Sequence, residues 1–122
     1  MAKILIVEDN PDNLKLFRAV LTIRGHRVVG LAGGDTLLET MRAETPQLVL
    51  LDIQLPGEDG FQLLAKLQKT LQDELPPVVA LTAHAMSGDE EKALTAGFTG
   101  YLTKPIDVGT FASTVEAFIP PA

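Results

Sequence analysis

The stretch LVLLDIQLPG, at residues 48–57, decides how this chain folds. A continuous apolar run ends there on a carboxylate, Asp52, and a Pro-Gly pair typical of a turn follows. Such a run indicates a strand that is buried on both faces, as in a parallel sheet. The acid then stands at the end of the strand, at the edge where open α/β folds build their sites. Asp52 is therefore the first candidate for chemistry.

Further segments show the same kind of short apolar run. They lie at residues 4–7, 28–31 and 78–81, with a shorter one around Tyr101 and Leu102, and we expect each to form a buried strand. Residues 36–42 and 88–95 are predicted to be helical. Three other groups of apolar residues share one face of a helix, namely Leu14, Phe17 and Leu21, then Leu64, Leu67 and Leu71, then Phe111, Val115 and Phe118.

Several of the predicted helices begin at a recognisable signal. These are Asn10 before Pro11, a capping box of Ser87 with Glu90, and Asp107. Strands and helices thus alternate along the chain, and this favours a parallel sheet with helices on both faces, because crossovers between parallel strands are nearly always right-handed. We expect an α/β fold, a doubly wound (βα)5 arrangement with a five-stranded parallel sheet.

The composition limits what the chain can do. It has 122 residues, no Cys and a net charge of -6. The length suits one domain over residues 1–122, and the lack of Cys excludes disulfides and thiolate chemistry. The negative charge disfavours non-specific nucleic-acid binding, and no apolar run approaches a signal peptide or a membrane span. We expect a cytoplasmic protein without nucleic-acid or membrane partners, either monomeric or weakly dimeric.

The parallel sheet predicts where the polar residues gather. All its carboxyl-terminal strand ends meet at one edge, which brings together Glu8, Asp9, Asp52, Thr82 and Lys104. Carboxylates packed this closely repel by roughly 4 kcal/mol per pair at ~4 Å and an effective dielectric near 20. A cation must relieve that repulsion, and hard oxygen ligands without His or Cys suit Mg²⁺. Together, these groups are suited to phosphoryl transfer onto Asp52 as the nucleophile.

Each of these residues also has a simpler interpretation. The residues before Pro11, namely Glu8, Asp9 and Asn10, are able to cap a helix, and the two acids also favour its dipole. For Asn10, capping is the preferred role. Lys104 is able to lie in a solvated loop, and Thr82 to cap its strand end. For each residue taken by itself, the simpler interpretation is favoured over a role in a common site. Together, at successive strand ends, the residues favour a common site.

The motifs at these positions resemble those of one known family. They are ILIVEDN at residues 4–10, LLDIQLPGEDG at 50–60, LTAHAM at 81–86 and AGFTGYLTKP at 96–105. In this order and spacing, the sequence is similar to the receiver domains of two-component response regulators, the CheY-like family. Its motifs are most similar to those of single-domain regulators of the DivK type and of the receiver modules of hybrid kinases. The resemblance spans essentially the whole chain and implies the flavodoxin-like strand order 2-1-3-4-5, for which the CheY fold is a standard example.

The resemblance implies a role for each acid at the site. Asp52 would take a phosphoryl group from a phosphohistidine on a sensor histidine kinase or histidine phosphotransfer protein. Asp9 would bind Mg²⁺ directly, Glu8 mainly through water, Asp52 by its side chain and Gln54 through its backbone carbonyl. Gln54 also flanks the site together with His84, and we hypothesise that both residues set the lifetime of the phosphorylated state.

The resemblance also implies how the signal leaves the site. Thr82 and Lys104 would hold phosphoryl oxygens, and Tyr101 would swing inward when Thr82 closes on the phosphoryl group. The Lys104–Pro105 bond would be cis. The surface formed by the fourth helix, fifth strand and fifth helix would then change for a downstream protein target. The expected function is thus signalling by a phosphoacceptor rather than enzyme turnover, without a DNA-binding output domain.

Two other classes of function are less well supported. Aspartyl-phosphate phosphatases of the haloacid dehalogenase type also use a strand-end Asp and Mg²⁺, but they need a second acid at the position that Gln54 occupies. A flavodoxin-like cofactor binder would need a first loop that donates hydrogen bonds to phosphate. Here that loop presents Glu8, Asp9 and Asp12 with Pro11, which has no N–H.

Overall fold

The structure is a computed structural model that describes residues 2–55, 57–83 and 89–120. Its strands are β1 (Lys3–Val7), β2 (Arg27–Leu31), β3 (Leu48–Asp52), β4 (Val78–Thr82) and β5 (Gly100–Thr103). Its helices are α1 (Pro11–Ile23), α2 (Leu37–Glu44), α3 (Gly60–Leu71), α4 (Asp89–Ala96) and α5 (Val108–Glu116), with a short 3-10 turn η1 (Gln72–Glu74) after α3. Each expected strand and helix is present, and the segments that were predicted with bounds shift by at most two residues at either end.

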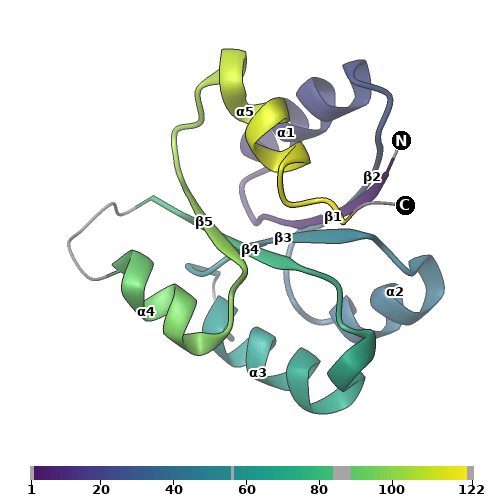
Figure 1. The fold of residues 1–122 in the computed structure, drawn as a ribbon, viewed down its shortest axis with the longest axis vertical. Helices are drawn as coiled ribbons and strands as arrows, with labels where there is room; N and C mark the ends of the chain where they lie inside the picture. Colours follow the sequence, from purple (N-terminus) through teal and green to yellow (C-terminus); the bar gives the residue numbers. More distant parts are fainter. Residues whose placement is uncertain (1, 56, 84–88, 121–122) are drawn as a thin grey trace.

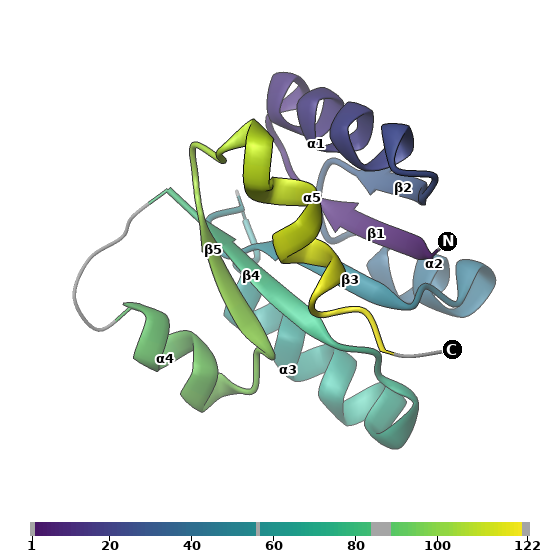
Figure 2. The same cartoon turned by 45° about the horizontal axis from the view of Figure 1, so that its top comes forward.

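The strands form one parallel sheet in the order β2-β1-β3-β4-β5. Helices α1 and α5 cover one face, and α2, α3 and α4 cover the other (Figure 1 and Figure 2). The predicted fold class and strand order are therefore confirmed. Among the described residues, no helix is both long enough and apolar enough to cross a membrane.

Alternation along the strands divides the interior into two cores. In β3, Leu48 and Leu50 pack with Phe17 of α1 and Phe111 of α5. The intervening residues Val49 and Leu51 belong to the other core. That core also contains Leu37 and Met41 of α2 and Leu63, Leu64 and Leu67 of α3. The central strand is buried on both faces, as its sequence predicts.

The helix starts follow the predicted signals where the structure describes them. Asn10 caps α1 by accepting hydrogen bonds from backbone N–H groups, and Asp107 caps α5. The predicted box at Ser87 lies outside the described residues. The sequence analysis missed the capping box of α3, in which Asp59 accepts from the Gln62 N–H at 2.9 Å and the Gln62 side chain accepts from the Asp59 N–H at 3.0 Å.

The end of α5 differs from the predicted pattern. The helix ends at Glu116, so Phe118 lies beyond it instead of continuing its apolar face. Pro120 follows and cannot extend a helix. The Phe118 ring packs against Gly100 of β5, where an added Cβ would approach the ring to 2.4 Å. Phe118 therefore packs against the core from the turn that follows α5.

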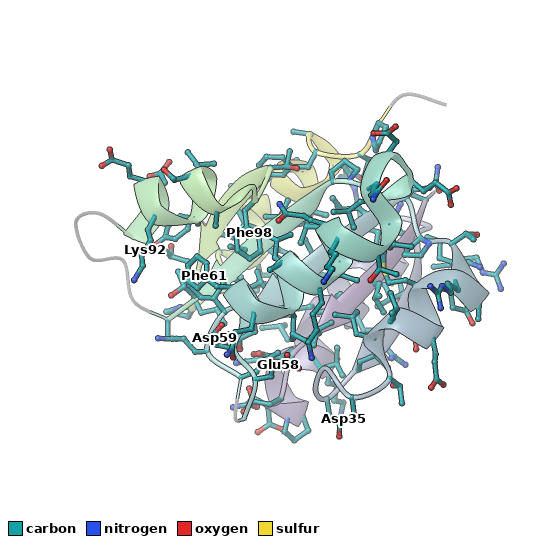
Figure 3. The ribbon with its side chains drawn as sticks, turned by 90° about the horizontal axis from the view of Figure 1, so that it is seen from below. Asp35, Glu58, Asp59, Phe61, Lys92 and Phe98 are labelled. Carbon is teal, nitrogen blue, oxygen red and sulfur yellow. The ribbon has the colours of Figure 1, made fainter. Side chains whose placement is uncertain are left out.

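Helix α4 is attached to α3 by side chains. The rings of Phe61 and Phe98 meet edge to face with centroids 5.7 Å apart, and the Lys92 ammonium lies 5.7 Å from the Phe61 centroid (Figure 3). The Gln68 side chain donates a hydrogen bond to the Ala96 carbonyl at 3.1 Å. The last turn of α4 is thereby held against α3.

The amino-terminal edge of the sheet is held by a polar cluster around Glu116. The His26 Nδ1 atom accepts from the Ala2 N–H at 3.1 Å, and its Nε2 atom lies 2.7 Å from Glu116 Oε2. Arg24 also pairs with this carboxylate. Because Nδ1 is an acceptor, the neutral ring carries its proton on Nε2 and donates it to Glu116. The cluster ties the end of α5 to the residue before β1 and to the turn after α1.

Candidate functional site

Polar side chains gather at the carboxyl-terminal edge of the sheet, where the sequence predicts them. Asp52 ends β3, Thr82 ends β4, Glu8 and Asp9 follow β1, and Lys104 follows β5. Glu8, Asp52 and Thr82 are the buried polar residues of the described part of the chain. The strand register aligns Val7 with Leu51 and Asp52 with Leu81, so successive strands end side by side. This arrangement places the side chains at one edge.

A close approach of backbones supports the start of α3 behind Asp52. Gly60 is the first residue of α3, and an added Cβ there would lie 2.5 Å from the Ile53 Cα and 2.8 Å from the Asp52 carbonyl oxygen. Its N–H also donates to the Ile53 carbonyl at 3.2 Å. Only glycine fits between the helix and the strand end at this distance.

The three acids form one cluster. Glu8, Asp9 and Asp52 each present a carboxylate oxygen, and these oxygens lie within 4.8 Å of one another. Asp9 is exposed, whereas Glu8 and Asp52 are buried. All the donors are hard oxygen atoms, which is the ligand set that Mg²⁺ prefers. The predicted acidic cluster is therefore present, and its chemistry fits a divalent cation.

Lys104 is shared between the two buried acids. Its ammonium lies 2.8 Å from Asp52 Oδ2, and 3.0 and 3.2 Å from the two Glu8 carboxylate oxygens. The predicted cis peptide bond is present between Lys104 and Pro105. The lysine is thus not a solvated loop residue but a direct partner of the acidic cluster.

Gln54 contacts the site through both its backbone and its side chain. Its N–H donates to Asp52 Oδ1 at 2.8 Å, and its side-chain Oε1 accepts from the Ala83 N–H at 3.1 Å. The second bond joins the loop after β3 to the loop after β4. Both loops line a pocket that also contains Asp9 and Lys104.

The buried acids have opposite pKa shifts. Burial raises the pKa of the Glu8 carboxyl group to about 7, and its contact with Asp52 acts in the same direction. Burial also acts to raise the pKa of Asp52, but hydrogen bonds with Glu8, Lys104 and the Gln54 N–H outweigh it, so this pKa is lowered. For Lys104, burial acts to lower the pKa, and the two carboxylates raise it overall. Asp52 therefore holds its negative charge more firmly than Glu8.

Asn10 and Asn13 have different places at this edge. Asn10 accepts from the N–H groups of Asp12 at 2.9 Å and Asn13 at 3.2 Å, which confirms its preferred role as a helix cap. Asn13 was not singled out from the sequence, yet its side-chain amide donates to Glu8 Oε1 at 2.8 Å. Its position in the first turn of α1, directly after the acids, is the signal that would have found it.

The remaining predicted residues lie on β4 and β5 or beyond the described part. Thr82 is fully buried at the end of β4, and Tyr101 is half-buried on β5. The two strands are neighbours, with Ala80 aligned to Tyr101 and Thr82 to Thr103. His84 lies outside the described residues.

Comparison with known proteins connects this geometry with a family. A sequence profile described as "Response regulator receiver domain" matches residues 4–116. The chain is 39% identical over 118 residues to the "Polar-differentiation response regulator DivK" of Brucella anthropi, covering 95% of this chain and 94% of the relative. It is 37% identical over 116 residues to the protein of the same name from Brucella ovis, with the same coverage.

Solved structures have the same fold. The BeF3-activated N-terminal receiver domain of Klebsiella pneumoniae RstA matches with a TM-score of 0.87 and 32% identity, over 98% of this chain and 99% of that chain. The chemotaxis protein CheY4 of Vibrio cholerae matches with a TM-score of 0.88 and 24% identity, over the same shares. At that lower identity, the second likeness concerns the fold alone.

Proposed function

This chain belongs to the response regulator receiver domain family, and on that premise we propose that it accepts a phosphoryl group on Asp52. A receiver domain is a signalling domain of a two-component system. The observation that carries the proposal is the position of the Asp52 carboxylate at the end of β3, between the Lys104 ammonium and the acidic pair after β1. The proposed donor is a phosphohistidine on a sensor histidine kinase or a histidine phosphotransfer protein.

The proposed transfer uses Asp52 as an oxygen nucleophile. One carboxylate oxygen forms a bond to phosphorus while the bond from phosphorus to the donor histidine nitrogen breaks, and the electron pair of that bond stays on the nitrogen. The lowered pKa of Asp52 keeps the nucleophile ionised at neutral pH. Lys104 lies within hydrogen-bond distance of Asp52, where its positive charge stabilises the oxygens of the transferred group.

The acidic cluster supports Mg²⁺ as the cofactor of this step. Asp9 and Asp52 would hold the ion by their side chains, Glu8 through water and Gln54 by its backbone carbonyl. When bound, a divalent ion offsets the negative charge that gathers on the phosphoryl oxygens. The hard oxygen donors within 4.8 Å of one another are the structural support for this assignment.

The proposed output depends on Thr82 and Tyr101. A phosphoryl group adds charge and three acceptor oxygens at Asp52, and these attract Thr82 and Lys104. Movement of Thr82 leaves space for Tyr101 to turn inward from the neighbouring strand. The surface of α4, β5 and α5 then changes, and a downstream protein that prefers this arrangement shifts the equilibrium toward it. We place the signalling domain over residues 1–122 and its action in the cytoplasm.

Intact-mass measurement tests the proposal. The protein is incubated with acetyl phosphate, with and without Mg²⁺, beside the variant Asp52→Asn. We expect a gain of one phosphoryl group that needs both the metal and Asp52. A gain that persists in Asp52→Asn would place the acceptor elsewhere. No gain, with a phosphohistidine donor tested as well, would contradict the proposed function.

A further inference from the structure

Asn13 makes a contact that the proposed reaction does not yet use. Its side-chain amide donates to Glu8 Oε1 at 2.8 Å. The Glu8 side chain is fully buried, so its carboxylate depends on protein donors. Within the described part of the chain, those donors are Asn13 and Lys104, and the same Oε1 atom accepts from both.

The two donors differ in what else they must do. Lys104 also pairs with Asp52 at 2.8 Å, so one ammonium serves two carboxylates. If Lys104 turns toward a phosphoryl group on Asp52, as the proposed function requires, Glu8 loses hydrogen bonds. Among the described residues, the Asn13 side-chain amide donates to Glu8 alone, and it stays beside Glu8.

The backbone of Asn13 is fixed in place. Asn13 is the third residue of α1, after Pro11 and Asp12, and its N–H donates to the Asn10 side chain at 3.2 Å. A helix position with a capped first turn aims a short side chain more precisely than a loop position does. The amide is also neutral, so it donates to Glu8 without adding a charge to the cluster.

We propose that Asn13 is a positioning residue, whose amide orients the Glu8 carboxylate toward the cation at the acidic cluster and holds it there when Lys104 moves to the phosphoryl group. This inference rests on the proposed function, because the cation and the movement of Lys104 belong to it. Groups that orient metal ligands from behind commonly change metal affinity 10–100-fold when they are removed. Asn13 is such a group, because its amide donates a hydrogen bond to the Glu8 carboxylate.

Calorimetric titration of the phosphoryl-free protein with Mg²⁺ tests the inference. We expect Asn13→Leu, which keeps the size but loses the donor, to bind Mg²⁺ about tenfold more weakly than the native chain. Lys15→Leu is the matched control, an exposed position in α1, and should bind within about twofold of the native chain. Equal affinity of Asn13→Leu and the native chain would overturn the inference.

A double-mutant cycle separates positioning from a general effect on the helix. In a Glu8→Gln background the charged group that Asn13 orients is gone, so adding Asn13→Leu should weaken Mg²⁺ binding by less than about twofold. The same tenfold loss in both backgrounds would show that Asn13 acts through α1 and not through Glu8. Asn13→Ala, which removes the donor without added bulk, repeats the cycle if Asn13→Leu does not fold.

These titrations are independent of phosphoryl uptake. Mg²⁺ affinity is measured without a phosphoryl donor, whereas the proposed function is tested by the mass gain on Asp52. Loss of the mass gain with an intact Asn13 effect would contradict the proposed function and leave the contact with Glu8 as a cation-positioning device. A normal mass gain without an Asn13 effect would contradict the positioning role alone.

Discussion

Glu8 and Asp52 are neighbouring buried acids, but they hold their protons differently. Burial acts to raise both pKa values, and the hydrogen bonds to each carboxylate determine whether its pKa is finally raised or lowered. Asp52 accepts from Lys104 through one oxygen and from the Gln54 N–H through the other, and its pKa is lowered. The Glu8 carboxyl group, with its pKa at about 7, is where a proton binds first. The proposed nucleophile is therefore ionised, and the neighbouring acid adjusts the charge of the site.

The first prediction concerns pH. Mg²⁺ binds more favourably when Glu8 is ionised. The affinity of the protein for Mg²⁺ should therefore rise as the pH increases through about 7, and Glu8→Gln should flatten that rise. The raised pKa of Glu8 means that the metal-free folded state binds more protons than the unfolded state between about 4.5 and 7. The contribution of Glu8 to stability is thus present below 4.5 and is lost as the pH rises through 7. Calorimetry and urea unfolding from pH 5.5 to 8 measure both trends, and parallel pH trends in native and Glu8→Gln proteins would refute this assignment.

The second prediction concerns Gln54 and the lifetime of the phosphoryl group. Its side chain is exposed at the pocket and accepts from the Ala83 N–H. We hypothesise that its polar amide holds the attacking water near Asp52. Gln54→Met removes the acceptor, and we expect dephosphorylation to slow roughly 2- to 10-fold, the equivalent of about 0.5–1.5 kcal/mol for one hydrogen bond. The decay of the phosphorylated mass after donor removal measures the rate.

A matched control for Gln54 exists at the opposite edge of the sheet. The Gln47 side chain accepts from the Lys3 N–H at 3.1 Å, a bond of the same kind far from the pocket. Gln47→Met should leave the decay rate unchanged. If both variants decay alike, Gln54 has no role in the lifetime.

At the scale of elements, the position of α3 is set by the end of β3. Gly60 allows the helix to begin against the backbone of Asp52 and Ile53, and Asp59 with Gln62 caps that start. Toward its other end, α3 holds α4 in place through the hydrogen bond from the Gln68 side chain to the Ala96 carbonyl. One helix thus contacts both the strand that carries Asp52 and the helix at the proposed output surface.

The third prediction tests the close approach at Gly60. In Gly60→Ala, the new Cβ would meet backbone atoms at 2.5 and 2.8 Å, which the helix relieves only by moving away from β3. We expect a loss of about 1–3 kcal/mol in the free energy of unfolding, as in overpacked sites. Gly33→Ala is the control, since nothing lies within 4 Å of an added Cβ there, and its effect should stay within about 0.5 kcal/mol. Urea unfolding compares the two, and equal stabilities would contradict the packing explanation.

At the scale of the whole molecule, the alternation of apolar runs and helical patterns was enough to predict a parallel sheet with helices on both faces, whereas the strand order was predicted from the family resemblance. Residues 48–51 alternate between the two cores because both faces of β3 are covered, so the apolar run itself carried the information. Asp52, Glu8 and Lys104 were predicted to meet because parallel strands end at one edge. The side-chain hydrogen bonds of Asn13 and Gln54 were not predicted, because they depend on the exact orientation of the first turn of α1 and of the loop after β3.

The fourth prediction concerns the polar cluster at the opposite edge. Hydrogen bonds from Arg24 and His26 lower the pKa of Glu116 to about 2. A lowered pKa gives stability that is present above about 4.5, the ordinary value, and is lost as the pH falls toward 2. We expect Glu116→Gln to be less stable than the native chain at pH 6 and to approach it at pH 3, measured by urea unfolding midpoints. A constant difference between the two proteins across this range would contradict the ionic role.

The net charge of the acidic cluster also follows from the contacts of Lys104. When all the groups are ionised, three carboxylates and one ammonium leave an excess of two negative charges. One divalent cation cancels this excess, whereas one monovalent cation leaves half of it. In the proposed transfer, the anionic phosphoryl group would therefore meet an electrically neutral site only after a divalent ion has bound. Potassium or sodium at the ionic strength of a cell screens the cluster but does not neutralise it. Under the proposed function, we therefore expect the valence of the cation to matter more for phosphoryl uptake than its abundance.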